Sequence, residues 1–154
     1  MPGDELRSLF RELPSPVGVV TLDVEGRAAG LTVDSLVSLS LEPPLLGIAL
    51  RRHAALHELL REAGTFAVSI LGAGQEHLAQ HFARGVPPIG LWTGIDTRTG
   101  ELGAPLIEGA LAWIECRLAS EHPVGDHTLF VGDVVSARRG PAREALVHLG
   151  GGYA

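Results

Sequence analysis

The amino-acid sequence predicts a mainly β protein, an α+β chain whose strands form an antiparallel barrel with a few short helices. Strand-like runs outnumber helical ones, and short turns join most neighbouring runs, which favours hairpins over the crossovers of a parallel sheet. The 154 residues contain no internal repeat and no linker, so we expect a single domain over 1–154. The strand-like runs are 17–24, 27–33, 45–50, 65–71, 110–120, 128–137 and 145–149.

The clearest local signal is a hairpin, because Glu25-Gly26 separates the apolar runs 17–24 and 27–33 by two residues. The helix at 54–62 is expected to end before Gly64, which takes the C-cap position that glycine prefers. The helical segments are 4–12, 54–62 and 75–83.

Two further segments are expected to lack regular structure. Residues 85–105 carry glycine and proline throughout, which predicts a long loop with at most one short strand near Gly90–Trp92. A loop of this length in a compact domain is usually functional. Residues 121–127 are expected to link the long strands at 110–120 and 128–137.

Residues 32–40, T-V-D-S-L-V-S-L-S, have the alternation of a strand with one mostly hydroxylic face. With a period of two, Thr32, Asp34 and Ser38 share that face, whereas Ser35 interrupts the apolar face. Clustered hydroxyls and free backbone N–H groups can recognise a polyhydroxyl chain or the edge of a heterocycle without a net charge. The pattern alone fits an exposed edge strand equally well.

The composition excludes several classes of function. All twelve basic residues are arginine, and the absence of lysine excludes Schiff-base chemistry, a P-loop lysine and a Ser-x-x-Lys acyl-transfer site. The formal net charge of −6 argues against nucleic acid and anionic membranes as partners, because both require a basic surface. No apolar run approaches the roughly 20 residues that span a bilayer.

The single cysteine, Cys116, cannot form an internal disulfide, which fits a reducing compartment. Its strand context predicts a buried structural thiol rather than a nucleophile. The N-terminal segment MPGDELRSLFREL is charged and lacks the apolar stretch of a signal peptide, so we expect a cytoplasmic protein. The hydrophobic share of 45% favours an oligomer, because buried interfaces raise apolar content.

Two motifs are better explained by structure than by chemistry. Residues 72–77, G-A-G-Q-E-H, follow a strand and open a helix, but His77 replaces the third glycine of a dinucleotide fingerprint. The pairs His77/His81 and His53/His57 have the i,i+4 spacing of metal ligands. No acid or cysteine completes either set, so we expect no metal site.

Two other segments are candidates for binding. Arg51-Arg52-His53 stands between a strand and the start of a helix, where free N–H groups and formal positive charge together suit a phosphate. Gly125-Asp126-His127 ends the link between two strands, and a histidine there could reach over the mouth of a barrel. From the pattern alone, a solvated basic turn and a surface histidine explain these residues as well.

Taken in order, these segments resemble one family, the short-chain flavin reductases of two-component monooxygenases, which have the FMN-binding split-barrel fold. The resemblance extends from Pro16 to Tyr153 and rests on the order and spacing of motifs that are individually weak. The matching residues are Gly18–Thr21, Gly30–Pro44, Gly64–Leu71, Gln75, Leu78-Ala79, Phe82-Ala83, Gly125–His127 and Gly152-Tyr153.

The resemblance implies an NAD(P)H-dependent flavin reductase, in which NADH or NADPH passes hydride to FMN or, alternatively, to FAD. It also implies a homodimer that supplies reduced flavin to a partner monooxygenase. His127 is the implied catalytic residue, on the nicotinamide side. The implied flavin-binding residues are Thr32, Val33, Asp34, Ser35, Leu36, Ser38, Leu39, Arg52, His53, Ala54, Phe82, Ala83 and Tyr153.

One segment departs from the family pattern. Serines or threonines commonly hold the phosphate at the start of the helix after the strand at 45–50, whereas this sequence has Arg52-His53-Ala54-Ala55. The departure leaves the choice between FMN and FAD open. A flavin-binding electron carrier or sensor without nicotinamide turnover is the alternative function, and an oxidase of the pyridoxamine-phosphate type is a further one.

Overall fold

The computed structural model describes residues 1–84 and 88–154. Its helices are α1 (Gly3–Phe10), α2 (Ala55–Ala63), α3 (Glu76–Ala83) and α4 (Pro88–Leu91). Its strands are β1 (Ser15–Pro16), β2 (Gly18–Val24), β3 (Arg27–Val33), β4 (Leu36–Leu41), β5 (Pro44–Arg51), β6 (Thr65–Ile70), β7 (Thr97–Thr99), β8 (Pro105–Ile107), β9 (Ala112–Val124), β10 (His127–Arg139), β11 (Val147–Leu149) and β12 (Gly152–Tyr153).

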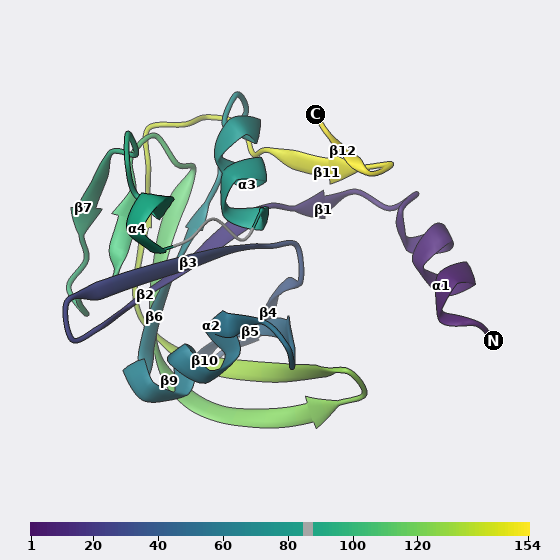
Figure 1. Ribbon diagram of the computed structural model, residues 1–154, viewed down its shortest axis with the longest axis horizontal. Helices are drawn as coiled ribbons and strands as arrows, with labels where there is room; N and C mark the ends of the chain where they lie inside the picture. Colours follow the sequence, from purple (N-terminus) through teal and green to yellow (C-terminus); the bar gives the residue numbers. More distant parts are fainter. Residues whose placement is uncertain (85–87) are drawn as a thin grey trace.

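Seven strands form one antiparallel sheet in the order β3-β2-β6-β9-β10-β5-β4. The sheet curls, so that its edge strand β3 lies opposite the strands β4, β5 and β10 in Figure 1. Among the described residues no ladder joins the two edge strands, β3 and β4, and the curl stays open between them. The predicted mainly β, antiparallel fold with a few short helices is confirmed.

The core has one main cluster, which joins side chains from β2, β5, β6, β10 and α2. Phe66 and Phe130 are fully buried at its centre, and α2 contributes Leu56 and Leu60 from one helical face. The helix ends as expected at Gly64, whose φ of 69° is left-handed. A second cluster lies around α3 and α4 and contains Phe82. Burial of this apolar surface holds the helices against the curled sheet.

The segment 32–40 is not one continuous strand. β3 ends at Val33 and β4 begins at Leu36, and a bulge separates Ser38 from Ser40 in the ladder to β5. The break occurs because the Ser35 hydroxyl donates to the carbonyl oxygen of Ala49 at 2.7 Å and accepts from its N–H at 3.2 Å. A side chain thus replaces the backbone pair that a continuing strand would have supplied.

The prediction of a long loop over 85–105 is wrong where short elements interrupt it, while residues 85–87 lie outside the described part. Helix α4 occupies the place of the expected strand near Gly90–Trp92, and β7 pairs with β8 in a hairpin. Side chains from other strands hold β8 in place. The Ser69 hydroxyl accepts from the Ile107 N–H at 3.0 Å, and the Thr21 hydroxyl donates to the Pro105 carbonyl at 2.6 Å.

The expected link over 121–127 is also wrong, because β9 and β10 continue through it to a two-residue turn at Gly125-Asp126. Gly125 has a φ of 60°, which suits glycine in a tight turn. The result is a long hairpin in which His127 begins β10, opposite Arg51 of β5.

The N-terminal helix α1 buries none of its residues and projects from the body of the molecule in Figure 1. The C-terminal end of α1 is held by a hydrogen bond in which the Gly150 N–H donates to the Arg11 carbonyl oxygen at 2.8 Å. No helix in residues 1–84 or 88–154 is long and apolar enough to cross a membrane.

Candidate functional site

Two adjoining hollows lie at the point where β3 ends, and both are lined by Thr32, Val33 and Asp34. The larger has a volume of about 280 Å³ and opens between β3 and the end of β5. The smaller has a volume of about 180 Å³ and opens toward the C-terminal hairpin β11–β12. Three consecutive residues of the predicted site therefore form a shared wall between two recesses.

The larger hollow has an apolar and a polar side. Leu31, Leu50 and Ala54 line it with apolar surface, whereas polar groups come from the break between β3 and β4 and from the ends of β5 and β10. Such a recess suits a flat heterocycle with a hydrophilic tail. The polar lining residues are Thr32, Asp34, Ser35, Arg51 and His127.

The break in the strand leaves backbone donors beside this hollow. Within the described residues, the N–H groups of Asp34 and Ser35 donate to no other group, because the Ser35 hydroxyl has taken over the pairing with Ala49. Backbone N–H groups need a partner when they are covered. A ligand in the hollow would supply acceptors for them, which is what a flavin's carbonyl-rich edge offers.

The charged end of the hollow is formed by Arg51 and His127, which are register partners in the β5–β10 ladder. The guanidinium of Arg51 forms no ion pair within residues 1–84 and 88–154, so its charge is available to an anion. His127 Nδ1 lies 2.6 Å from Asp126 Oδ1. This hydrogen bond, together with the charge of His127, lowers the pKa of the Asp126 carboxyl and keeps it ionised.

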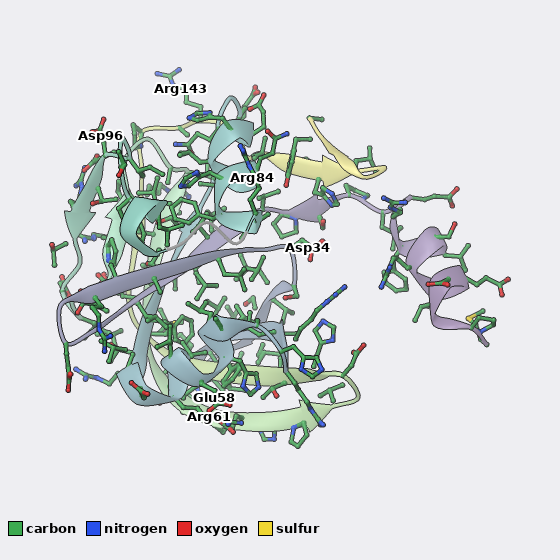
Figure 2. All side chains as sticks on the ribbon, viewed as in Figure 1. Asp34, Glu58, Arg61, Arg84, Asp96 and Arg143 are labelled. Atoms are coloured by element: carbon green, nitrogen blue, oxygen red, sulfur yellow. The ribbon has the colours of Figure 1, made fainter. Side chains whose placement is uncertain are left out.

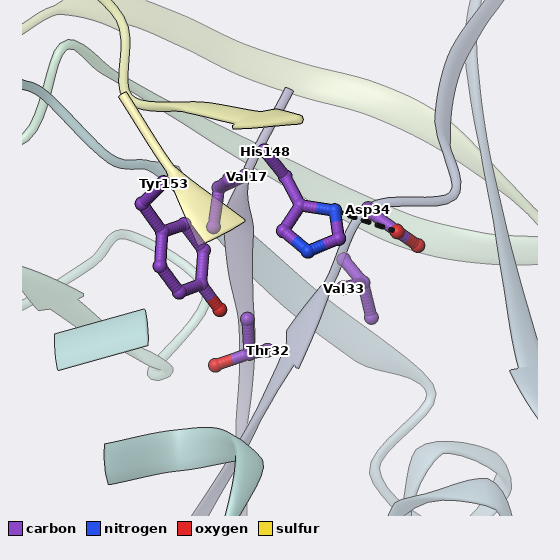
Figure 3. A pocket seen from close by; sticks show the side chains of 6 residues that line it. All are labelled: Val17, Thr32, Val33, Asp34, His148 and Tyr153. Carbon is purple, nitrogen blue, oxygen red and sulfur yellow. Dashed lines mark ion pairs between the residues drawn. The ribbon is translucent and has the colours of Figure 1, made fainter. Parts of the chain in front are cut away.

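The smaller hollow gathers Asp34, His148, Tyr153 and Thr32 around one opening (Figure 3). His148 Nδ1 lies 3.7 Å from Asp34 Oδ2, and its ring packs against that of Tyr153 with centroids 5.3 Å apart. Burial raises the pKa of the Tyr153 hydroxyl, and the nearby Asp34 charge raises it further. Tyr153 therefore remains a neutral hydrogen-bond donor at physiological pH.

Other predicted site residues lie outside these hollows. Leu36 packs against the main core, while Ser38 and Leu39 are exposed on the edge strand β4. Arg52 lines a separate groove beside α2, and His53 is exposed. Their proposed contact with flavin remains a prediction.

Phe82 and Ala83 close α3, on the other side of β3. Phe82 is only 2% exposed, and its ring fills the space above Gly30, where a Cβ would approach it to 3.1 Å. Ala83 is exposed. Thr32 connects this helix to the site, because its hydroxyl donates to the Ala79 carbonyl oxygen at 2.7 Å.

Sequence reasoning did not select Arg51 or His148 as individual site residues, although both line the hollows. The motif Arg51-Arg52-His53 marked the segment, but the sequence does not show which of the two arginines lines the hollow. His148 carries no signal in the sequence. It reaches Asp34 only because the C-terminal hairpin folds back beside β1.

The remaining motifs have structural roles. The Gln75 side chain accepts from the Gly72 N–H and donates to the Glu108 carbonyl oxygen, which fixes the turn into α3. His57 is buried and pairs through Nε2 with the Thr128 hydroxyl at 2.7 Å. Among the residues that the structure describes, no group of three or more His, Cys, Asp or Glu side chains is placed to hold a metal ion.

Cys116 is fully buried in the main core. Burial raises the pKa of its thiol to about 12, with smaller contributions from Asp133 and Glu115. Since the thiolate is the reactive form, we expect Ellman's reagent at a pH near 8 to leave the native protein unmodified and to titrate one thiol after unfolding. Rapid reaction of the folded protein would contradict this placement.

The family is decided by comparison with known proteins. Residues 10–154 match the sequence profile described as "Flavin reductase like domain". The chain belongs to the flavin reductase-like family. It is 43% identical over 152 residues to an NADH-dependent FAD reductase of Streptomyces globisporus, covering 97% of this chain and 83% of that protein.

Two further members of the flavin reductase-like family extend the comparison. The chain is 38% identical over 152 residues to the reductase component of a Thermus thermophilus 4-hydroxyphenylacetate 3-monooxygenase, covering 96% of this chain and 95% of that protein. The solved NADH:FAD oxidoreductase of Streptomyces globisporus C-1027, in complex with NAD and FAD fragments, has a TM-score of 0.92 at 41% identity. That match covers 98% of this chain and 90% of the solved one.

The donor set fits the flavin that this family implies. Free backbone N–H groups at Asp34 and Ser35 match the acceptor atoms of an isoalloxazine edge, and the Thr32 hydroxyl, which donates to Ala79, could still accept a hydrogen bond from a ribityl hydroxyl. Arg51 offers an unpaired cation for a phosphate, and Leu31 and Leu50 offer apolar contact for the ring. No lysine or acid–base pair is needed.

Proposed function

We propose that this chain is an NADH-dependent flavin reductase that transfers hydride from reduced nicotinamide to flavin, with FMN and FAD both within its substrate class. The single observation that carries the proposal is the larger hollow, in which free backbone N–H groups, an apolar wall and the unpaired Arg51 occur together. Membership of the flavin reductase-like family supports it. The flavin supplies the electron-accepting ring, which takes up hydride when it is bound.

The chain's own residues would bind the flavin, orient its ring and stabilise the charge that develops on it. The N–H groups of Asp34 and Ser35 stabilise negative charge at the polar edge of the ring as it is reduced. Thr32 and Tyr153, which line the smaller hollow, would help to orient the ring, and Arg51 would hold the phosphate. Positioning the two rings in contact is the main task of the protein in hydride transfer.

His127 stands at the mouth of the larger hollow, and we assign it to the nicotinamide side. Its Nδ1 is held by Asp126, so the ring is oriented and Nε2 remains available to a substrate amide or phosphate. Of the remaining predicted flavin contacts, Val33 and Ala54 would touch the ring or ribityl chain from the hollow's wall. Leu36, Ser38, Leu39, His53, Phe82 and Ala83 would have to approach it from outside this wall.

We further propose a cytoplasmic homodimer of single-domain chains that delivers reduced flavin to a partner monooxygenase. The open face of the hollows and the apolar side chains exposed beside them on β4 support a second subunit covering this edge. The exposed side chains are Val37, Leu39 and Leu41. The relationship to a reductase component of a monooxygenase supports the partner.

The proposal is tested by mixing purified protein with NADH and excess FMN or FAD and following NADH oxidation. Turnover with either flavin is expected. Failure with both would overturn the function, and a tightly bound flavin that NADH cannot bleach would favour the electron carrier instead.

Replacing His127 with alanine should raise the KM for NADH about fivefold, because one hydrogen bond is worth about 1 kcal/mol. The KM for flavin should change less than twofold. Steady-state kinetics of wild type and H127A, with H122A on the neighbouring strand as the matched histidine control, provide the measurement. An unchanged KM for NADH in H127A would remove His127 from the site.

A further inference from the structure

Two adjacent arginines leave the end of β5 in different directions. Arg51 lines the larger hollow, whereas Arg52 lines a separate groove of about 320 Å³ between α2 and the β9–β10 hairpin. The turn between them is fixed by the Arg52 N–H, which donates to the Asp126 carbonyl oxygen at 3.2 Å. The two cationic side chains therefore stand at the entrances of neighbouring recesses.

The groove beside α2 is ordered before any ligand arrives. Arg61 bridges the helix to the hairpin, with its Nη2 2.6 Å from Glu121 Oε1 and its Nη1 3.0 Å from Glu58 Oε1. The floor is closed by His57, whose Nε2 pairs with the Thr128 hydroxyl at 2.7 Å. Glu58 and Arg61 both extend from α2 and lie close together in Figure 2.

The charges of the groove leave Arg52 without a partner. Arg61 is engaged by both carboxylates, and the hydrogen bond from Arg61 lowers the pKa of Glu121, which keeps that carboxylate ionised. Arg52 forms no ion pair in the described ranges 1–84 and 88–154. An anion that reached past Arg51 would therefore meet a second available guanidinium.

We propose that this groove binds the adenylate half of FAD, and that Arg52 is the residue by which the enzyme prefers FAD to FMN. This inference rests on the proposed function. FMN carries one phosphate, for which Arg51 suffices, whereas FAD carries a diphosphate with two anionic groups in series. Two guanidiniums at neighbouring recesses match the diphosphate.

The remaining groups of the groove suit the adenosine. The carboxylates of Glu58 and Glu121 can accept hydrogen bonds from the vicinal hydroxyls of a ribose, and Pro123 presents an apolar ring to the adenine. The N-terminus of α2 lies between the two recesses and has no side-chain cap, so its free N–H groups add to the field around the bridging diphosphate.

The test is a comparison of flavin kinetics at saturating NADH and low salt. Wild type should show a KM for FAD about tenfold below that for FMN. Arg52→Ala should raise the KM for FAD about tenfold and that for FMN less than twofold, because a charge-assisted contact to the second phosphate is lost. Arg52→Lys should retain part of the FAD preference.

The matched control is Arg143→Ala, an exposed arginine at the opposite edge of the molecule (Figure 2), which should leave both constants unchanged. Thermal midpoints of R52A and wild type should agree, since the backbone bond to Asp126 is kept. A second measurement needs no variant: AMP, which is the adenylate half of FAD and carries one phosphate, should raise the apparent KM for FAD but not that for FMN.

An equal rise in the KM for FAD and for FMN in R52A would place Arg52 on the phosphate that both flavins share and overturn the groove assignment. An unchanged KM for FAD in R52A, or no effect of AMP on the KM for FAD, would overturn it as well. If wild type reduced neither flavin, the proposed function itself would fail, and the result would be recognised before any variant was compared.

Discussion

Replacing Ser35 with alanine will lower the free energy of unfolding by about 2 kcal/mol. The hydroxyl makes two hydrogen bonds to Ala49, one as donor and one as acceptor, and alanine would leave both backbone groups of Ala49 without these partners. A covered polar group that loses its partner costs about 1–3 kcal/mol. Urea unfolding followed by circular dichroism provides the measurement.

The same substitution should also weaken flavin binding about tenfold or more. Without the hydroxyl, the chain at 34–35 can pair with Ala49 only through its own backbone, which would remove the free N–H groups from the hollow. Flavin affinity is measured by quenching of flavin fluorescence. A variant that lost stability but kept affinity would separate the strand break from the binding site.

Ser38 provides the matched control within the same segment. Its side chain is exposed and makes no hydrogen bond within the described residues, so S38A should change stability by less than about 0.5 kcal/mol. If Ser38 bonds the flavin, as the family resemblance implies, S38A should still weaken binding by about 1 kcal/mol. Equal loss of stability in both variants would contradict the special role of Ser35.

The contrast between these two serines shows what the sequence could predict. Alternation correctly gave Thr32 and Val33 to a strand, but it treated 32–40 as one strand, which is wrong because the chain breaks at Asp34 and Ser35. It could not show that the hydroxyl replaces a ladder pair, because that depends on the position of Ala49 in a different strand. Local periodicity carries no information on such long-range contacts.

The same limit explains the other errors. The hairpin at Glu25-Gly26 and the end of α2 at Gly64 were predictable, because each depends on the backbone freedom of nearby residues. The β7–β8 hairpin was not, since buried groups outside it hold it in place. Glu115 is one of them, with Oε1 accepting from the Leu102 N–H at 3.0 Å.

Candidate site residues divide in the same way. The segment Thr32–Ser35 and the residues His127 and Tyr153 were found from motifs and do line the hollows. The motif gave the segment 51–53 but not the face of each side chain: Arg51 lines the larger hollow, whereas Arg52, which the resemblance implies for the phosphate, lines a separate groove. Only the β5–β10 register, with Arg51 opposite His127, distinguishes the two arginines.

Replacing Arg51 with alanine will raise the KM for both FMN and FAD about thirtyfold. Its guanidinium lines the larger hollow and has no ion-pair partner within residues 1–84 and 88–154, so a bound phosphate would be its counter-charge. A hydrogen bond between charged groups contributes about 1.5–3 kcal/mol, which corresponds to about 10- to 100-fold in affinity. Steady-state kinetics with each flavin at saturating NADH provide the measurement.

The pattern across flavins separates Arg51 from Arg52. Both flavins share the first phosphate, so R51A should affect them equally, whereas R52A should affect FAD alone. The KM of wild type should also rise with ionic strength, and that rise should be smaller in R51A, because salt screens the exposed guanidinium. If R51A bound both flavins as tightly as wild type, the phosphate would lie elsewhere. The orientation of the flavin in the hollow, with its ring beside the free N–H groups of Asp34 and Ser35, would then have to be reversed.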